Sequence, residues 1–158
     1  MYKITVVGVG YVGLVAGVCF AEAGHQVTCL DVDEIKMKML EGGNSPIYEA
    51  DLEELIRKNN EEGRLRFTTD YRIAYHDVDA IFIGVGTPER PDGSAELSHI
   101  ATVARQIAET IVTDCLVVVK STVPVGTNDK VEQFIRDFLV NDVKVEVAAN
   151  PEFLAQGT

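Results

Sequence analysis

The sequence has little or none of several features that mark other classes of protein. It contains no tryptophan, three cysteines and three histidines, and only 14 Lys and Arg against 25 Asp and Glu. A net charge of −11 disfavours binding to nucleic acid or to an anionic membrane surface. No apolar run approaches the ~20 residues of a membrane span, and the first residues lack the basic leader of a signal peptide. We therefore expect a cytoplasmic protein with no nucleic-acid or membrane partner.

The three cysteines are odd in number and widely spaced, which argues against a disulfide framework and against a zinc site. Cys19 lies on an apolar helical stripe, Cys29 lies within a predicted strand, and Cys115 comes just before another one. We predict that all three are small buried hydrophobic residues, and we expect no metal site.

A dense pattern of structural signals opens the chain. The β-branched run at residues 4–7 predicts a buried strand, and the sequence GVGYVG follows it at residues 8–13. A helix is predicted next, until Gly24 ends its apolar stripe of Val12, Val15, Ala16, Cys19, Phe20 and Ala23. A second strand at 26–30 ends in Asp31, close to the ~20-residue spacing of a dinucleotide-binding signature.

Each part of this signature has a physical role toward a dinucleotide. Gly8 permits a tight turn, Gly10 lets the backbone approach the pyrophosphate, and Gly13 lets the helix pack closely. The helix N-terminus offers N–H groups and a partial positive charge to the diphosphate. Asp31 would accept hydrogen bonds from the adenosine ribose and repel a 2′-phosphate, which favours NAD over NADP. The alternative is a glycine-rich turn with a surface aspartate and no ligand.

Strands and helices alternate through the rest of the chain. A short helical segment is predicted after Asp70, and longer helices are predicted at 35–40, 52–60, 100–111 and 131–139. Further strands are predicted at 65–67, 80–83, 116–119 and 143–147. The fold class is therefore α/β, with one doubly wound parallel sheet of Rossmann type in a single three-layer αβα domain over residues 1–158. The loops after the strands at 80–83 and 116–119 leave the sheet edge where ligands bind in such folds.

Several segments resemble the UDP-glucose/GDP-mannose dehydrogenase family. They are GVGYVGL at 8–14, PIYE at 46–49, VGTP at 85–88, KSTVPVGT at 120–127 and NPEFL at 150–154. The resemblance covers essentially the whole chain, and its last two motifs are far more specific than the glycine turn. Within the family, the chain most resembles the enzymes that oxidise UDP-glucose.

The resemblance implies an activity. Members of the family oxidise the primary alcohol of a sugar nucleotide to a carboxylate with two NAD⁺, through a thioester on a cysteine. By resemblance, the chain is the NAD-binding domain of an NAD-dependent dehydrogenase that acts on a CH–OH group and converts UDP-glucose to UDP-glucuronate. The family's catalytic-cysteine and sugar-nucleotide-binding domains match nothing here, so we expect a piece that is inactive alone. The implied partners are a UDP-sugar, the remaining domains of the full-length chain, and a second copy in a homodimer.

The resemblance also implies which residues contact the cofactor. Asp31 and Lys36 match the positions that hold the adenosine ribose and the neighbouring phosphate, although Lys36 is also explained as a solvated helix lysine. The expected NAD contacts are Gly8, Gly10, Tyr11, Val12, Gly13, Asp31, Lys36, Val85, Gly86, Thr87, Ser121 and Thr122.

Three further residues, together with Thr122, are implied in catalysis and substrate binding. Thr122 would help to position a catalytic water, and Glu152 would act as acid and base in thioester hydrolysis. Glu152, Phe153 and Leu154 would form part of the sugar-nucleotide cradle, and an exposed apolar patch near Leu154 would dock the missing domain. Gln156 departs from the family pattern, which usually has a second glutamate there, so a charge role at that position is in doubt.

Other functions stay open at this point. The sugar nucleotide could be a UDP-N-acetylhexosamine or GDP-mannose, and a non-catalytic NAD-binding module is a further alternative. A 3-hydroxyacid or 6-phosphogluconate dehydrogenase opens with a similar glycine turn, but the segments at 120–127 and 150–154 argue against that reading.

Overall fold

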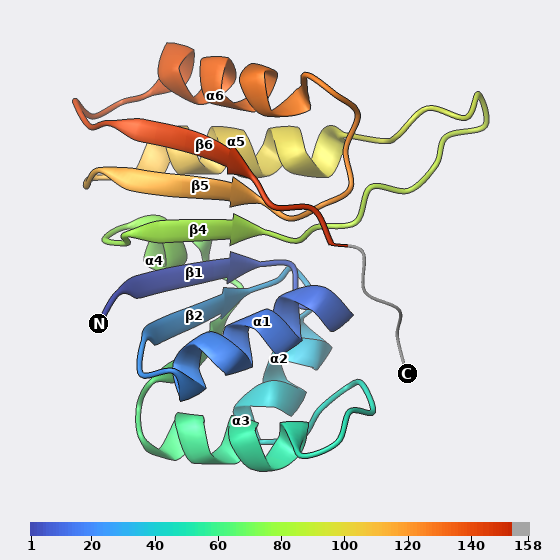
Figure 1. Ribbon diagram of the computed structural model, residues 1–158. Coiled ribbons are helices and arrows are strands. Elements are labelled where there is room, and N and C mark those ends of the chain that lie inside the picture. Colours follow the sequence, from blue (N-terminus) through green and yellow to red (C-terminus); the bar gives the residue numbers. More distant parts are fainter. Residues whose placement is uncertain (153–158) are drawn as a thin grey trace.

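Six parallel strands form one sheet in the order β3-β2-β1-β4-β5-β6, as the computed structural model shows for its described residues, 1–152 (Figure 1). The strands are β1 (Lys3–Val7), β2 (Gln26–Leu30), β3 (Leu65–Thr68), β4 (Ala80–Ile83), β5 (Cys115–Val119) and β6 (Val145–Ala149). The chain winds outward from β1 to β3 and then in the other direction from β4 to β6. The strand order therefore reverses between β1 and β4, which is the switch point of a doubly wound sheet. The α/β fold predicted from the sequence is confirmed.

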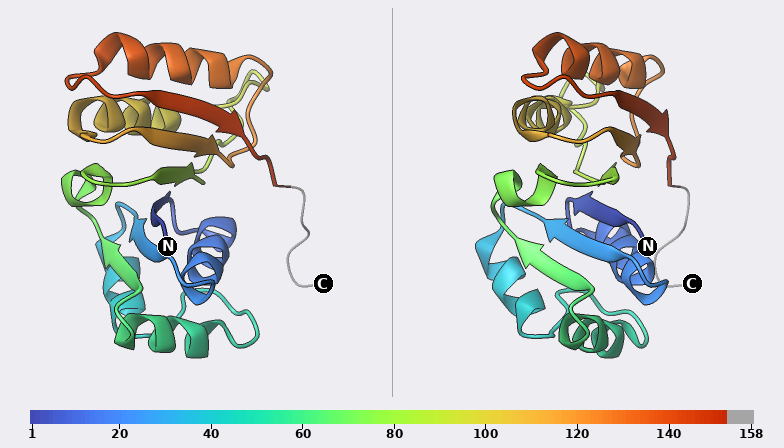
Figure 2. Two further views of the ribbon diagram at one scale, coloured as in Figure 1. Left: turned by 60° about the vertical axis from the view of Figure 1, so that its left-hand side comes forward. Right: turned by 90° about the vertical axis from the view of Figure 1, so that its left-hand side faces the viewer.

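Helices cover both faces of the sheet, and α1 and α5 lie on opposite faces (Figures 1 and 2). The helices are α1 (Tyr11–Glu22), α2 (Glu34–Glu41), α3 (Leu52–Glu61), α4 (Tyr71–Tyr75), α5 (Ser98–Thr110) and α6 (Thr127–Phe138). One hydrophobic cluster joins α1, α2 and α3 to β1, β2 and β3, while the other joins α4, α5 and α6 to β1, β4 and β5. Strand residues alternate between the two clusters, so Val6 belongs to the first and Val7 to the second.

Helix α1 packs through a face that the sequence analysis predicted wrongly. The buried residues are Gly13, Leu14, Gly17, Val18 and Ala21, whereas Cys19 of the predicted stripe is exposed. The prediction failed because the helix is apolar on almost all sides, so its sequence pattern does not identify one buried face. Gly17 explains the choice: a Cβ on this residue would lie 2.8 Å from the Sγ of Cys29. The helix therefore approaches the sheet along the side that carries its glycines.

Three other details differ from the expectations. Strand β6 begins at Val145 and not at residue 143, and Cys115 is the first residue of β5 and does not precede it. Cys29 and Cys115 are buried as predicted, but Cys19 is not. The apolar residues Ile35, Met39 and Leu40 predicted helix α2, but the exposed fraction of Ile35 is 79%, whereas Met37 is buried together with Leu40. A helix of only two turns leaves several faces equally plausible from sequence alone.

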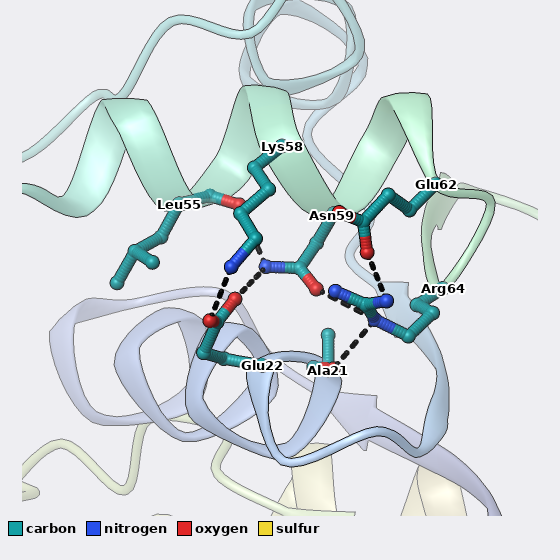
Figure 3. Close-up of polar contacts among 7 residues, drawn as sticks. All are labelled: Ala21, Glu22, Leu55, Lys58, Asn59, Glu62 and Arg64. Atoms are coloured by element: carbon teal, nitrogen blue, oxygen red, sulfur yellow. Dashed lines mark hydrogen bonds and ion pairs between the residues drawn. The ribbon is translucent and has the colours of Figure 1, made fainter.

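A polar network fixes the C-terminal end of α1 against α3 and the start of β3 (Figure 3). The fully buried amide of Asn59 donates to Glu22 Oε2 at 2.9 Å and accepts from Arg64 Nε at 3.0 Å. Arg64 Nε also donates to the carbonyl oxygen of Ala21 at 3.0 Å, and Lys58 Nζ pairs with Glu22 Oε1 at 2.5 Å. The pKa of Glu22 is lowered, chiefly by the hydrogen bonds from Lys58 and Asn59. The carbonyl groups at this helix end are thus partly satisfied by the side chain of Arg64, which directly precedes β3.

Candidate functional site

The predicted ligand-binding segments meet at the carboxyl edge of the sheet, where the arrowheads in Figure 1 point. Backbone hydrogen bonds join the chain segments that leave neighbouring strands. Gly8 N donates to the carbonyl oxygen of Leu30 at 2.8 Å, and Gly84 N donates to that of Val7 at 2.8 Å. These bonds link the segments that follow β1, β2 and β4 into one continuous rim.

Two glycines of the turn after β1 are required by its geometry. Gly8 has a φ of +87°, and a Cβ there would lie 2.7 Å from the carbonyl oxygen of Gly84. A Cβ on Gly13 would lie 1.9 Å from the carbonyl oxygen of Gly8. By contrast, a Cβ on Gly10 would meet no atom of residues 1–152 within 4 Å. Gly8 and Gly13 therefore shape the turn, while the space beside Gly10 is open to a ligand.

The N-terminus of α1 points its backbone N–H groups at this open space. Within the described part of the chain, no side chain caps this helix end, and its first turn carries no acidic residue. Leu14 N donates to the carbonyl oxygen of Gly10 at 2.9 Å, so regular helical bonding begins there. The N–H groups before Leu14, together with the helix dipole, form a site suited to an anion such as a pyrophosphate.

Asp31 lies at the end of β2 and binds the glycine turn through its carboxylate. Its Oδ2 accepts from the backbone N–H of Val9 at 2.9 Å, and its Oδ1 accepts from that of Asp33 at 3.1 Å. Lys36 Nζ lies 3.5 Å from the same Oδ2. The structure therefore brings Asp31 and Lys36 together beside the turn, and their contacts with a ribose or a phosphate stay predictions.

The loops after β4 and β5 are joined by side-chain hydrogen bonds. The buried hydroxyl of Ser121 donates to the carbonyl oxygen of Val85 at 2.7 Å. The hydroxyl of Thr87 donates to the carbonyl oxygen of Thr122 at 2.9 Å. Four of the predicted contact residues thus form one unit at the edge of the sheet, with the side chain of Thr122 exposed to solvent. Their roles toward NAD and a catalytic water stay predictions.

Lys120 also lies at this edge, although the sequence analysis gave it no role. Its Nζ donates to Asn150 Oδ1 at 2.8 Å and lies 3.9 Å from Glu152 Oε2. The exposed fraction of the Lys120 side chain is only 13%, and that of Glu152 is 21%. Asn150 N in turn donates to the carbonyl oxygen of Val119 at 3.0 Å, which fixes the segment after β6 against β5. The ammonium group of this largely buried side chain therefore lies between the two chain segments that carry the specific motifs.

Tyr11 connects the glycine turn to a second loop and to Glu152. Its hydroxyl donates to Glu49 Oε2 at 2.7 Å, so the loop that carries the PIYE motif is attached to the start of α1. The pKa of the Tyr11 phenol is raised, first by this hydrogen bond, then by burial and by the negative charges of Glu49 and Glu152. The carboxylate of Glu152 therefore lies within electrostatic range of both Lys120 and Tyr11.

Two predicted substrate contacts, Phe153 and Leu154, and the departing residue Gln156 lie outside the described residues, as does the expected apolar patch. Glu49 and Asn150 were quoted in motifs but received no role. The only sequence signal for them was membership of a motif, because their contacts join segments far apart in the chain.

Within residues 1–152, no group of three or more His, Cys, Asp or Glu side chains is arranged to hold a metal ion.

Comparison with known proteins gives relatives that match nearly the whole chain. It is 51% identical over 156 residues to UDP-glucose 6-dehydrogenase YwqF of Bacillus subtilis and 50% identical over 157 residues to the UDP-glucose 6-dehydrogenase of Rhizobium meliloti. These alignments cover 99% and 98% of the chain but 36% of each relative. The chain thus spans about a third of the length of the curated relatives that it matches.

A solved structure and a family profile agree with these relatives. A UDP-glucose dehydrogenase from the archaeon Pyrobaculum islandicum superimposes with a TM-score of 0.93 at 41% identity, covering 100% of this chain and 37% of that one. The profile described as "UDP-glucose/GDP-mannose dehydrogenase family, NAD binding domain" matches residues 2–158. The chain therefore belongs to the UDP-glucose/GDP-mannose dehydrogenase family, as its N-terminal NAD-binding domain.

Proposed function

We propose that this chain is the cofactor-binding part of a UDP-glucose 6-dehydrogenase, which oxidises UDP-glucose to UDP-glucuronate with two NAD⁺. The observation that carries this proposal is the identity of about half of all residues with two proteins named UDP-glucose 6-dehydrogenase. The geometry of the sheet edge agrees, because the predicted contact residues converge there from β1, β2, β4 and β5.

The residues at this edge fit a dinucleotide in three respects. The space beside Gly10 is open, so a pyrophosphate can approach the backbone there. The start of α1 offers N–H groups that no side chain of residues 1–152 caps. The carboxylate of Asp31 lies at the end of β2, where it can accept hydrogen bonds from ribose hydroxyls while its charge disfavours a 2′-phosphate. Lys36 would then lie close to the same ribose.

The chain's own catalytic contribution would come from Thr122 and Glu152. Bound NAD⁺ supplies the acceptor for the hydride that leaves the carbon being oxidised. The exposed hydroxyl of Thr122 would hold a water, and the carboxylate of Glu152 would accept a proton of that water as its oxygen bonds to the thioester carbonyl carbon. The C–S bond would then break, which releases the carboxylic acid, and the proton would pass from Glu152 to the cysteine thiolate.

The remaining parts of the enzyme are proposed to lie in the rest of the full-length protein. They would supply the catalytic cysteine, most of the sugar-nucleotide pocket and the contacts of a homodimer. We further propose a cytoplasmic location without nucleic-acid or membrane partners. No helix in the part of the chain that the structure describes is long and apolar enough to span a membrane.

The proposed function is tested with the chain and the full-length protein in parallel. Calorimetric titration of this chain should give saturable binding of NAD⁺ and weaker binding of NADP⁺, without NADH formation when UDP-glucose is added. The full-length protein should form NADH from UDP-glucose, followed by absorbance, and should prefer it to GDP-mannose and to UDP-N-acetylhexosamines. If the full-length protein forms NADH with none of these sugar nucleotides, the result would favour a non-catalytic NAD-binding module. Preference for GDP-mannose would move the assignment to the GDP-mannose dehydrogenase branch of the family.

A further inference from the structure

The side chain of Lys120 is largely buried, and its ammonium group contacts two polar side chains of another segment. Its side chain is 13% exposed, and burial of an ammonium group is unfavourable without an anionic or polar partner. The partners are the carbonyl oxygen of the Asn150 side chain at 2.8 Å and the carboxylate of Glu152 at 3.9 Å. Both follow β6, whereas Lys120 directly follows β5. The ammonium group therefore joins two segments that belong to different strands.

The backbone around Lys120 is itself held firmly. Lys120 N donates to the carbonyl oxygen of Ile83 at 2.8 Å, and Asn150 N donates to that of Val119 at 3.0 Å. These bonds fix the ends of β4, β5 and β6 relative to one another. The backbone of Lys120 is therefore held by these strand ends, and the hydrogen bond to Asn150 directs its ammonium group toward the segment after β6, which also carries Glu152.

We propose that Lys120 is a positioning residue for Glu152, which it holds by charge attraction in the orientation needed for thioester hydrolysis. This inference rests on the proposed function, since it assigns Glu152 to the hydrolytic step. Asn150 accepts one hydrogen bond of the ammonium group and directs the remaining positive charge toward the carboxylate. Lys120 thus acts through Glu152 and not on the cofactor or the sugar.

The role predicts a specific kinetic defect. The two hydride transfers precede hydrolysis, so loss of Lys120 should leave them intact and slow only the release of the acid from the cysteine. In the full-length protein, Lys120→Met should lower kcat by about tenfold or more, with the KM values for UDP-glucose and NAD⁺ changed less than about twofold. Stopped-flow absorbance should then show a burst of two NADH per active site before a slow steady state.

A double-mutant cycle separates positioning of Glu152 from a general structural role. The variants are Lys120→Met, Glu152→Gln and the double variant, each in the full-length protein, with thermal unfolding measured for all of them. If Lys120 acts through Glu152, its replacement should change kcat by less than about twofold once Glu152 is already Gln. If Lys120→Met does not fold, Lys120→Gln takes its place, because the amide keeps a donor for Asn150 and removes only the charge.

A matched control lies at the opposite edge of the same two strands. Lys144 pairs with Glu146 at 2.6 Å on the surface, and Lys144→Met should leave kcat and the burst unchanged. The positioning role would be overturned if Lys120→Met lowered kcat by the same factor whether residue 152 is Glu or Gln. It would also be overturned if Lys120→Met raised KM and left kcat unchanged. Failure of the wild-type protein to oxidise UDP-glucose would overturn the proposed function itself, and this inference with it. Normal wild-type turnover with an unimpaired Lys120→Met variant would overturn this inference alone.

Discussion

Replacement of Asp31 by alanine should weaken both the fold and the discrimination between cofactors. The carboxylate accepts hydrogen bonds from the N–H groups of Val9 at 2.9 Å and Asp33 at 3.1 Å, and its side chain is 13% exposed. A hydrogen bond to a charged group contributes about 1.5–3 kcal/mol, and the bond to Val9 is the more buried of the two. The ion pair with Lys36 adds about 0–1 kcal/mol because it is partly exposed. We therefore expect Asp31→Ala to lose about 2–3 kcal/mol of unfolding free energy.

The effect on ligand binding is expected to be smaller but more specific. Loss of hydrogen bonds to the adenosine ribose should weaken NAD⁺ binding about five- to tenfold. Loss of the negative charge should reduce the ratio by which the chain prefers NAD⁺ to NADP⁺. Denaturant titration of this chain gives the change in unfolding free energy, and thermal unfolding should show a fall in Tm of about 5–10 °C. Calorimetric titration with NAD⁺ and NADP⁺ gives the two affinities.

Asp33→Ala is the matched control for Asp31. Asp33 is an acid two positions away that caps α2 by accepting from Lys36 N at 3.0 Å. Its loss should cost about 1 kcal/mol of stability and leave the ratio of NAD⁺ to NADP⁺ affinity unchanged. An Asp31→Ala variant as stable as the wild-type chain would refute the argument from the Val9 hydrogen bond. An unchanged affinity ratio would refute the ribose assignment.

Three further predictions concern packing and burial. Gly17→Ala should lower the unfolding free energy by up to about 2 kcal/mol in denaturant titration, because a clash with Cys29 Sγ of about 1–3 kcal/mol outweighs the ~1 kcal/mol gain in helix propensity. Adding Cys29→Ala should reverse this loss, and a double variant whose loss equals the sum of the two single losses would contradict the explanation. Burial raises the pKa of the Cys29 and Cys115 thiols to about 12, so a thiol reagent at about pH 8 should label only Cys19 in the native chain and all three cysteines after denaturation; rapid native labelling of a second thiol would disagree. Asn59→Ala should cost about 1–3 kcal/mol in the same titration, since it breaks the buried network around Glu22; a neutral result would assign those hydrogen bonds no net stabilisation.

The strands could be predicted well because a parallel sheet buries both of its faces. The run from Leu116 to Val119 is continuously apolar, and its three valines are β-branched, which identifies it as a strand. Strand ends are also well defined where a polar residue or a glycine follows, as after Leu30 and Ile83. Strand β6 was placed two residues too early, because the apolar alternation begins at Val143 while pairing with β5 begins only at Val145.

The packing face of α1 could not be predicted for a different reason. Apolar periodicity identifies a face only when the other faces are polar, and this helix has almost no polar residue to mark one. The choice falls to shape: the side with Gly13 and Gly17 allows the closest approach to the sheet. The pattern of hydrophobic residues does not show which side packs closest, because that depends on the distance between the helix backbone and the sheet.

The candidate site was predicted as a set of strand ends, but its internal contacts were not. The topology of a doubly wound sheet already places the segments after β1, β4 and β5 at one edge. The pairing of Lys120 with Asn150 and of Tyr11 with Glu49 depends on side-chain lengths and directions across elements far apart in the chain. Such contacts depend on how the folded chain places distant segments, so the sequence indicated these residues only through the motifs that contain them.

The central position of the first strand has a consequence for the order of events during synthesis. β1 is made first, yet it is complete only when β4 pairs with its second side, with Ile4 opposite Ala80. Gly8 also rests against Gly84, so the glycine turn, at which we propose that the pyrophosphate binds, is not supported until β4 has left the ribosome. Long-range parallel pairing of this kind forms slowly. A nascent chain therefore gains no stabilisation from NAD⁺ until its second half begins to fold.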